Sequence, residues 1–67
     1  MKVKFEKQVT VEFVKDSDEF LVEHDKTFYP NEVVEVNNIT EVVRGFLDLT
    51  FDDGVAIGVP KQGLTIL

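Results

Sequence analysis

The chain has 67 residues, enough for one domain spanning residues 1–67. Its 13 acidic and 7 basic side chains give a formal net charge of −6, which opposes non-specific binding to nucleic acid and to anionic membranes. It has no cysteine, so disulfides, zinc–thiolate sites and thiol catalysis are excluded. The opening residues lack the continuous apolar stretch of a signal peptide, and a cytoplasmic location is therefore expected.

The first segment, from Lys2 to Val14, alternates between apolar and polar side chains. The apolar residues share one parity: Val3, Phe5, Val9, Val11 and Phe13. A period of two predicts a half-buried strand. The segment is long for a single strand, and Lys7 falls on the apolar parity, so a bend, a bulge or a rim position is expected near Lys7.

The middle of the chain is read as short strands between polar turns. The pattern predicts turns at 15–19, 25–27 and 37–38, and strands at 20–24 and 32–36. Between the two strands, Pro30 breaks the pattern because proline cannot donate to a sheet ladder. In the second strand, Val34 and Val36 are expected on one face.

A second long segment runs from Ile39 to Phe51. Its alternation predicts a strand in which Gly45 marks a sharp bend or a bulge, as glycine inside a strand often does. An alternative for residues 38–43 is a short helical turn capped by Asn38, with Glu41 at the third position.

A hairpin is predicted around Asp52, Asp53 and Gly54. A two-residue loop of Asp53 and Gly54 would set the apolar parity of one strand against the small-residue parity of the other. A three-residue loop ending on left-handed Gly54 places all the large residues on one face, and we therefore expect this loop. The residues expected to point inward together are Leu47, Leu49, Phe51, Val55, Ile57 and Val59.

The last residues end that strand and begin another. Pro60 stops the ladder and Gly63 supplies a positive φ, and their spacing suits a single 3₁₀ turn near Pro60 before a final strand at 64–67. Short strands with tight turns and no helix hide their edges best by closing on themselves. The predicted fold class is all-β, a small barrel of five to six strands.

The segment from Leu47 to Leu67 resembles the last part of an SH3-like small barrel, in which a one-turn 3₁₀ helix commonly separates the last two strands. The resemblance implies a fold and no binding residues, because the first half of the chain departs from the pattern. The aromatic ligand-binding cluster of SH3 domains is absent, and only Phe28, Tyr29 and Pro30 could replace it. An open two-layer sheet or an OB-like barrel is the alternative fold.

No arrangement of residues predicts catalysis, a metal site or a cofactor. His24 lies between two acidic residues, but neighbours on a strand point to opposite faces, and no second histidine completes a metal site. The acidic runs at 16–19 and 52–54 lack the ligand spacing of a calcium loop. Ser17 has neither a nearby histidine nor a glycine elbow. We therefore expect a non-enzymatic protein without cofactors.

The sequence contains more apolar residues than one core face needs. Those predicted on the opposite face are Val14, Leu21, Val33, Val42, Phe46 and Leu67. Such residues often mark a contact with another chain. The competing interpretation is that strong curvature, or a bulge near Gly45, turns some of them inward.

The first functional hypothesis is a protein-interaction module that binds a protein partner or a second copy of itself. Its patch would be built from Phe46, Val42 and Tyr29, with Phe28 beside them. Carboxylates around the patch would steer a basic partner: Glu32, Glu35, Glu41 and Asp48.

Two alternatives come from other classes of protein. The short, acidic chain resembles in type the small phage-encoded inhibitors that occupy the nucleic-acid-binding groove of a host protein. The weaker alternative is a barrel that binds nucleic acid itself through Lys2, Lys4 and Lys7, with stacking from Phe28 and Tyr29. The net negative charge argues against this last reading.

Overall fold

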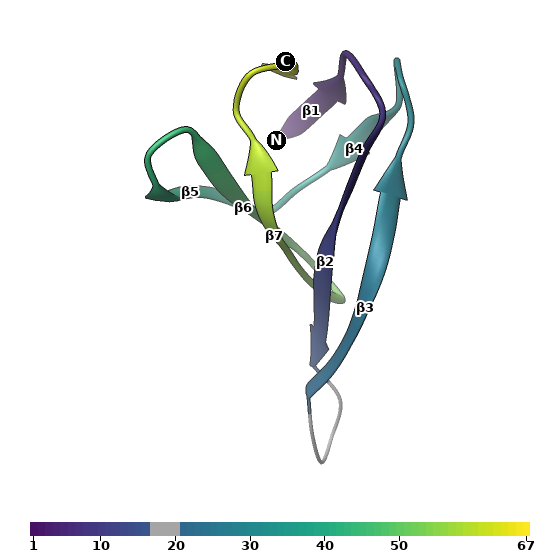
Figure 1. The fold of residues 1–67 in the computed structure, drawn as a ribbon, viewed down its shortest axis with the longest axis vertical. Helices are drawn as coiled ribbons and strands as arrows, with labels where there is room; N and C mark the ends of the chain where they lie inside the picture. Colours follow the sequence, from purple (N-terminus) through teal and green to yellow (C-terminus); the bar gives the residue numbers. More distant parts are fainter. Residues whose placement is uncertain (17–20) are drawn as a thin grey trace.

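The computed structural model of the protein describes residues 1–16 and 21–67. In these residues, alternating β-branched and aromatic side chains favour extended backbone, and the chain forms eight strands (Figure 1). The strands are β1 (Lys2–Phe5), β2 (Val9–Asp16), β3 (Leu21–Phe28), β4 (Val33–Glu35), β5 (Asn38–Val43), β6 (Phe46–Phe51), β7 (Gly54–Pro60) and β8 (Leu64–Ile66). The all-β prediction is confirmed. The turn predicted at 15–19 is wrong at its start, because Lys15 and Asp16 belong to β2, and its remainder lies outside the described residues together with Ser17.

The strands pair into two antiparallel sheets. One has three strands in the order β4-β1-β8, and the other has five in the order β3-β2-β7-β6-β5. The break expected near Lys7 is confirmed, because the chain leaves β1 after Phe5 and enters the other sheet at Val9. In Figure 1 the β2–β3 hairpin extends well beyond the remaining strands. No helix in the described part of the chain is long and apolar enough to cross a membrane.

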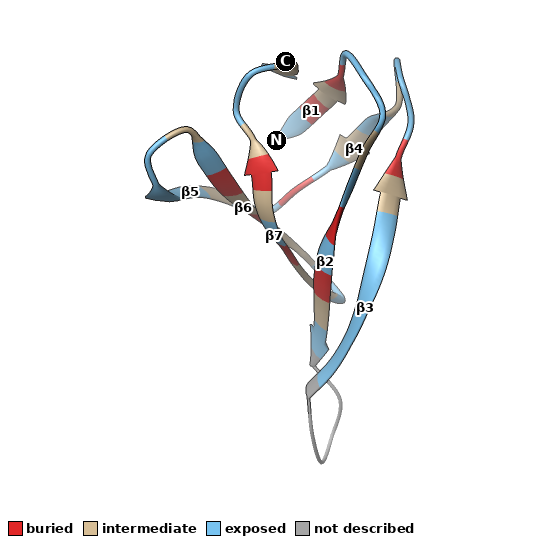
Figure 2. Cartoon of the chain, viewed as in Figure 1, coloured by how far each residue is buried: buried red, intermediate tan, exposed pale blue. Residues whose placement is uncertain are grey.

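The core lies between the two sheets, where Figure 2 shows short buried stretches on most strands. The parity predicted for the first segment is confirmed, since its apolar residues are buried or packed on the core. Three aromatic rings stack through the centre. Phe5 and Phe28 are parallel with centroids 4.4 Å apart, and Phe51 lies 6.1 Å from Phe28. The fully buried residues include Val36, as its predicted face requires.

β3 is longer than predicted, and residues 25–27 belong to it rather than to a turn. Its polar residues are accommodated because β3 is an edge strand paired with β2 along its whole described length. Lys26 lays its ammonium group 5.1 Å from the Phe13 ring centroid, a cation–π contact that covers the core. The polar run at 25–27 therefore reflects an edge strand.

The β6–β7 hairpin differs from both loops considered. Phe51 pairs with Gly54, so the loop is Asp52 and Asp53, and Gly54 is not in the left-handed region. The ladder then shifts between Leu47 and Leu49, where Gly58 has φ +73°. This bulge changes which residues of β7 point inward.

The inward set predicted for the hairpin is therefore only partly right. Leu47, Leu49 and Val59 are buried and Phe51 packs on the core, as expected. Leu49 faces Ala56 instead of Ile57, however, and Ala56 is fully buried. Val55 and Ile57 consequently share the outward parity, and Ile57 is 39% exposed.

Gly45 reverses the chain instead of bending a strand. Val43 pairs with Phe46, so Arg44 and Gly45 form a tight turn in which Gly45 has φ +85°. The helical alternative for residues 38–43 is wrong, because β5 occupies this segment.

The expected 3₁₀ turn near Pro60 is also wrong. Pro60 ends β7, and the chain then turns with the Leu64 N–H donating to the Lys61 carbonyl over 3.3 Å. Gly63, with φ +90°, occupies the third position of this β-turn, where a type II turn requires a positive φ.

Candidate interaction surfaces

The outer face of the five-stranded sheet carries exposed apolar side chains. Because Phe13, Leu49 and Ala56 point into the core, their neighbours along the strands point outward. Val14 and Val55 face each other across β2 and β7, and Phe46 pairs with Val43 across β6 and β5. We call this set the outer patch: Val14, Val43, Phe46, Val55 and Ile57. Four of the residues predicted on the opposite face are exposed, so curvature does not turn them inward: Val33, Val42, Phe46 and Leu67.

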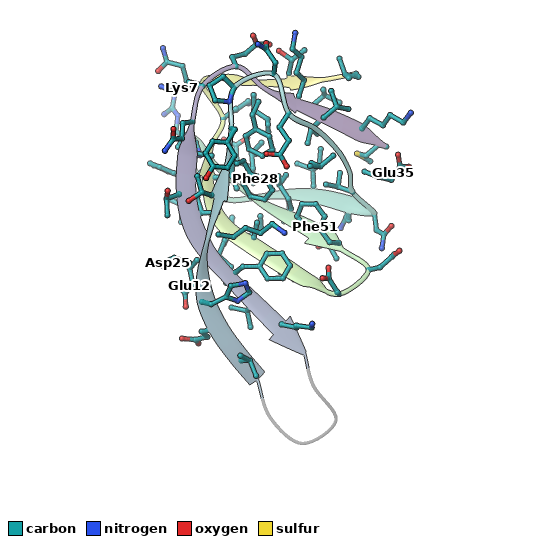
Figure 3. All side chains as sticks on the ribbon, turned by 90° about the vertical axis from the view of Figure 1, so that its right-hand side faces the viewer. Lys7, Glu12, Asp25, Phe28, Glu35 and Phe51 are labelled. Atoms are coloured by element: carbon teal, nitrogen blue, oxygen red, sulfur yellow. The ribbon has the colours of Figure 1, made fainter. Side chains whose placement is uncertain are left out.

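Carboxylates border the outer patch. Glu12 pairs with Ile57 on one side and with Asp25 on the other, and Figure 3 shows Glu12 and Asp25 projecting from the same side of the β2–β3 hairpin. Glu23 and Asp48 share this parity. Lys15 and Lys26 have the opposite parity, so their side chains do not lie on this face. In the described strands of this sheet, the ionisable side chains on the outer face are therefore all acidic.

Glu12 is the most crowded of these acids. A hydrogen bond shared with Glu23 raises the pKa of Glu12 above its usual 4.5, and the negative charges of Glu23 and Asp25 add to this. The electrostatic part of this shift arises because the negative charges of Glu23 and Asp25 oppose ionisation of Glu12. The face thus holds concentrated negative charge that a cationic partner would relieve.

Glu12→Gln is expected to stabilise the protein at neutral pH. Because the folded chain holds the Glu12 proton more tightly than the unfolded chain, wild-type stability rises as pH falls toward the raised pKa. The variant should show a higher melting temperature at about pH 7 and a smaller gain on acidification to about pH 5. Thermal unfolding by circular dichroism measures both, with Asp53→Asn as the control that changes net charge equally. If Glu12→Gln and Asp53→Asn changed the melting temperature equally, this would contradict the expected repulsion between Glu12 and its neighbouring carboxylates.

Asp48 is fixed at the centre of this face. Its Oδ1 atom accepts a hydrogen bond from the Gly58 N–H over 3.2 Å, so the carboxylate closes the bulge in the neighbouring strand. The bulge that turns Ile57 outward thus also orients Asp48 beside it. Asp48 was expected at the border of the patch, whereas the position of Ile57 could not be predicted without the register of the ladder.

The structure divides the predicted site. Phe46 and Asp48 lie on the outer patch, and Val42 lies in the irregular part of β5 beside it and is 67% exposed. Tyr29 is 56% exposed but directly follows β3, and Figure 1 shows β3 and β5 at opposite sides of the view. Tyr29 therefore belongs to a different surface.

The other predicted carboxylates, like Asp48, have partners within the chain. Glu32 accepts from the Tyr29 N–H over 3.0 Å, and Glu35 lies 3.5 Å from the N-terminal ammonium. Glu41 accepts from the Gly45 N–H over 2.9 Å and from the Lys61 ammonium over 3.2 Å. These bonds lower the pKa of Glu41, with the backbone bond the larger cause. Glu32, Glu35 and Glu41 therefore interact with groups of the same chain.

Phe28 was wrongly predicted as a surface residue. It is fully buried and stacks on Phe5, because β3 continues through it into the core. The aromatic pair proposed to stack on nucleic acid is thereby reduced to Tyr29 alone. Lys2 and Lys4 lie on β1, and Lys7 lies in the turn after it.

Sequence reasoning missed the residues that complete the outer patch. Ile57 and Val55 were assigned to the core, and Glu12 and Asp25 were not connected because 25–27 was read as a turn. The only available signal was Gly58, since a glycine inside a strand often marks a bulge.

His24 lies edge-on to the Phe13 ring, with centroids 5.4 Å apart. Within residues 1–16 and 21–67, no three side chains of histidine, cysteine or acidic type are grouped to hold a metal.

No protein-family model matches the chain, and searches of curated proteins and of solved structures found no match. Function must therefore be argued from the surface itself.

Proposed function

We propose that the chain is a non-enzymatic protein-interaction module that binds a basic protein partner through the outer patch. The observation that supports this is an exposed apolar group, including Phe46 and Ile57, whose ionisable neighbours on the described strands of the sheet are all carboxylates. The apolar side chains would supply burial, while Glu12, Asp25 and Asp48 would attract a cationic surface and repel acidic proteins.

Charge favours a different chain over a second copy. Two copies joined through this face would bring together like-charged carboxylates, and each chain already carries a net charge of −6. A face with acidic groups alone also suits the nucleic-acid-binding groove of a host protein, which is basic. A phage-type inhibitor is therefore the second candidate function.

The order of the strands supports an SH3-like small barrel as the finer description of the fold. β4 and β5 follow each other closely, β5, β6 and β7 form a meander, and β8 returns to pair with β1. The lack of cysteine is compatible with a cytoplasmic location.

Phe46→Glu is expected to abolish partner capture. An additional carboxylate at the patch would remove apolar contact and add desolvation cost, reducing affinity about tenfold or more for a central residue. The control is Tyr29→Glu, which changes another exposed aromatic residue on a different surface. The immobilised wild-type, Phe46→Glu and Tyr29→Glu chains are compared by capture from a cell lysate, and captured proteins are then purified and titrated.

The proposal expects basic proteins on the wild-type and Tyr29→Glu chains, and binding that weakens as salt rises. Equal capture by Phe46→Glu would contradict the outer patch. If light scattering showed that the wild-type chain self-associates and that Phe46→Glu does not, the partner would be a second copy of the chain instead of a basic protein.

A further inference from the structure

A groove of about 390 Å³ lies on the inner side of the β5–β6 hairpin, away from the outer patch. Its walls are mostly apolar and come from β5, β6, β8 and the turn before β8: Ile39, Glu41, Leu47, Lys61, Leu64 and Ile66. Lys61 and Glu41 pair with each other, 3.2 Å apart, so the groove offers no uncompensated charge. It therefore fits an apolar and uncharged group.

Among residues 1–16 and 21–67, β8 has a paired neighbour on one side only, which is β1. The Leu67 N–H donates to the Lys2 carbonyl and the Glu6 N–H donates to the Gly63 carbonyl, which fixes the phase of the β1–β8 ladder. Hydrogen-bonded and non-hydrogen-bonded pairs alternate in an antiparallel ladder, so the Ile66 N–H and C=O point away from β1. Ile66 thus presents one donor and one acceptor at the edge of the sheet.

The other edge strands are protected in ways that β8 is not. β3 carries charges on both faces, including Glu23, Asp25 and Lys26. β5 has a register shift after Thr40, and β4 ends on Glu35. Charges and bulges protect edges from pairing with other chains; β8 is short, but Leu64, Thr65 and Ile66 carry no charge and form no bulge. Ile66 is also 61% exposed.

We propose that the groove binds an extended peptide segment that adds to the free edge of β8, with apolar side chains at alternate positions and basic residues at its ends. An extended peptide backbone supplies an acceptor and a donor at the spacing that the N–H and C=O of Ile66 require. Side chains of the added strand opposite Leu64 and Ile66 would point toward Ile39 and Leu47, because cross-strand neighbours share a face. The basic ends complement the net charge of −6, which disfavours a second copy.

The test uses a short fluorescein-labelled peptide with valine at alternate positions, threonine between them and lysine at both ends. Ile66→Pro removes the outward N–H without breaking a β1–β8 bond, and Ile66→Ala removes the side chain but keeps the N–H. Fluorescence anisotropy should show binding to Ile66→Ala about tenfold tighter than to Ile66→Pro. The same peptide with N-methylated backbone amides should bind weakly to every chain.

Hydrogen exchange gives an independent readout, because the Ile66 amide should become protected when the peptide binds. Equal affinity of the two variants, undiminished binding of the N-methylated peptide, or absence of binding at about 1 mM would overturn strand addition. Protection of Ile66 without peptide, with a dimer in sedimentation that Ile66→Pro dissociates, would show a second copy there instead. Phe46→Glu should leave peptide binding unchanged, because its side chain lies on the other face.

Discussion

Replacing Gly54 with alanine is expected to destabilise the fold by about 3 kcal/mol, the upper part of the range for overpacking. A Cβ atom at this position would lie 2.5 Å from the Val14 carbonyl oxygen and 2.6 Å from Cε1 of Phe13. Neither atom can yield easily, because one belongs to the backbone of a paired strand and the other to a buried ring. A domain of this size rarely has more than about 3–5 kcal/mol in total, so much of the variant should be unfolded at 25 °C.

Gly58→Ala is the matched control, since a Cβ there meets nothing within 4 Å and only its φ of +73° opposes the substitution. That conformational cost is about 1–2 kcal/mol. Urea denaturation of the two variants compares steric overlap with backbone strain. Equal midpoints would mean that the close approach of Phe13 to Gly54 is not maintained in solution.

The role of Gly54 illustrates what the sequence can indicate. A glycine after two aspartates correctly predicts a hairpin, but the sequence reading assigned this glycine to a left-handed loop position. Its actual role depends on Phe13, which is distant in the sequence and comes within reach only through the β2–β7 pairing. Local pattern therefore located the turn, whereas the reason for glycine was non-local.

Alternation predicted faces well wherever a strand kept its register. Val3, Phe5, Val11 and Phe13 are buried as expected, and the break between β1 and β2 was indicated by Lys7. The prediction failed at Gly58, because one extra residue in a strand reverses the faces on one side of it.

The candidate surface could likewise be predicted only where the alternation within one strand determines which side chains are exposed. Phe46 and Val42 were expected to be exposed because each is an apolar residue on a polar parity, and both are exposed. The acidic border could not be found in this way, since Glu12 and Asp25 become neighbours only through the β2–β3 ladder. The exposure of a residue can be predicted from the pattern of its own strand, whereas contacts that depend on the pairing of two strands cannot.

Phe28→Ala is expected to cost about 3–5 kcal/mol, the usual range for removing a buried phenylalanine side chain. The ring is fully buried, and it lies between Phe5 and Phe51 and beneath the Lys26 ammonium. Its loss would remove contacts to both sheets at once, because Phe5 belongs to β1 and Phe51 to β6. We therefore expect little folded protein by near-UV circular dichroism or by dispersion of amide proton shifts.

Tyr29→Ala changes the adjacent aromatic residue and should alter stability by no more than about 0.5 kcal/mol, as most exposed positions do. Phe28→Leu keeps most of the apolar volume, so the variant should remain folded with a midpoint between those of wild type and Phe28→Ala. A folded Phe28→Ala chain with selectively weakened partner binding would restore Phe28 to the interaction surface. Loss of folding would instead mean that the two neighbouring aromatics differ in role because the end of β3 turns one inward and leaves the next in solvent.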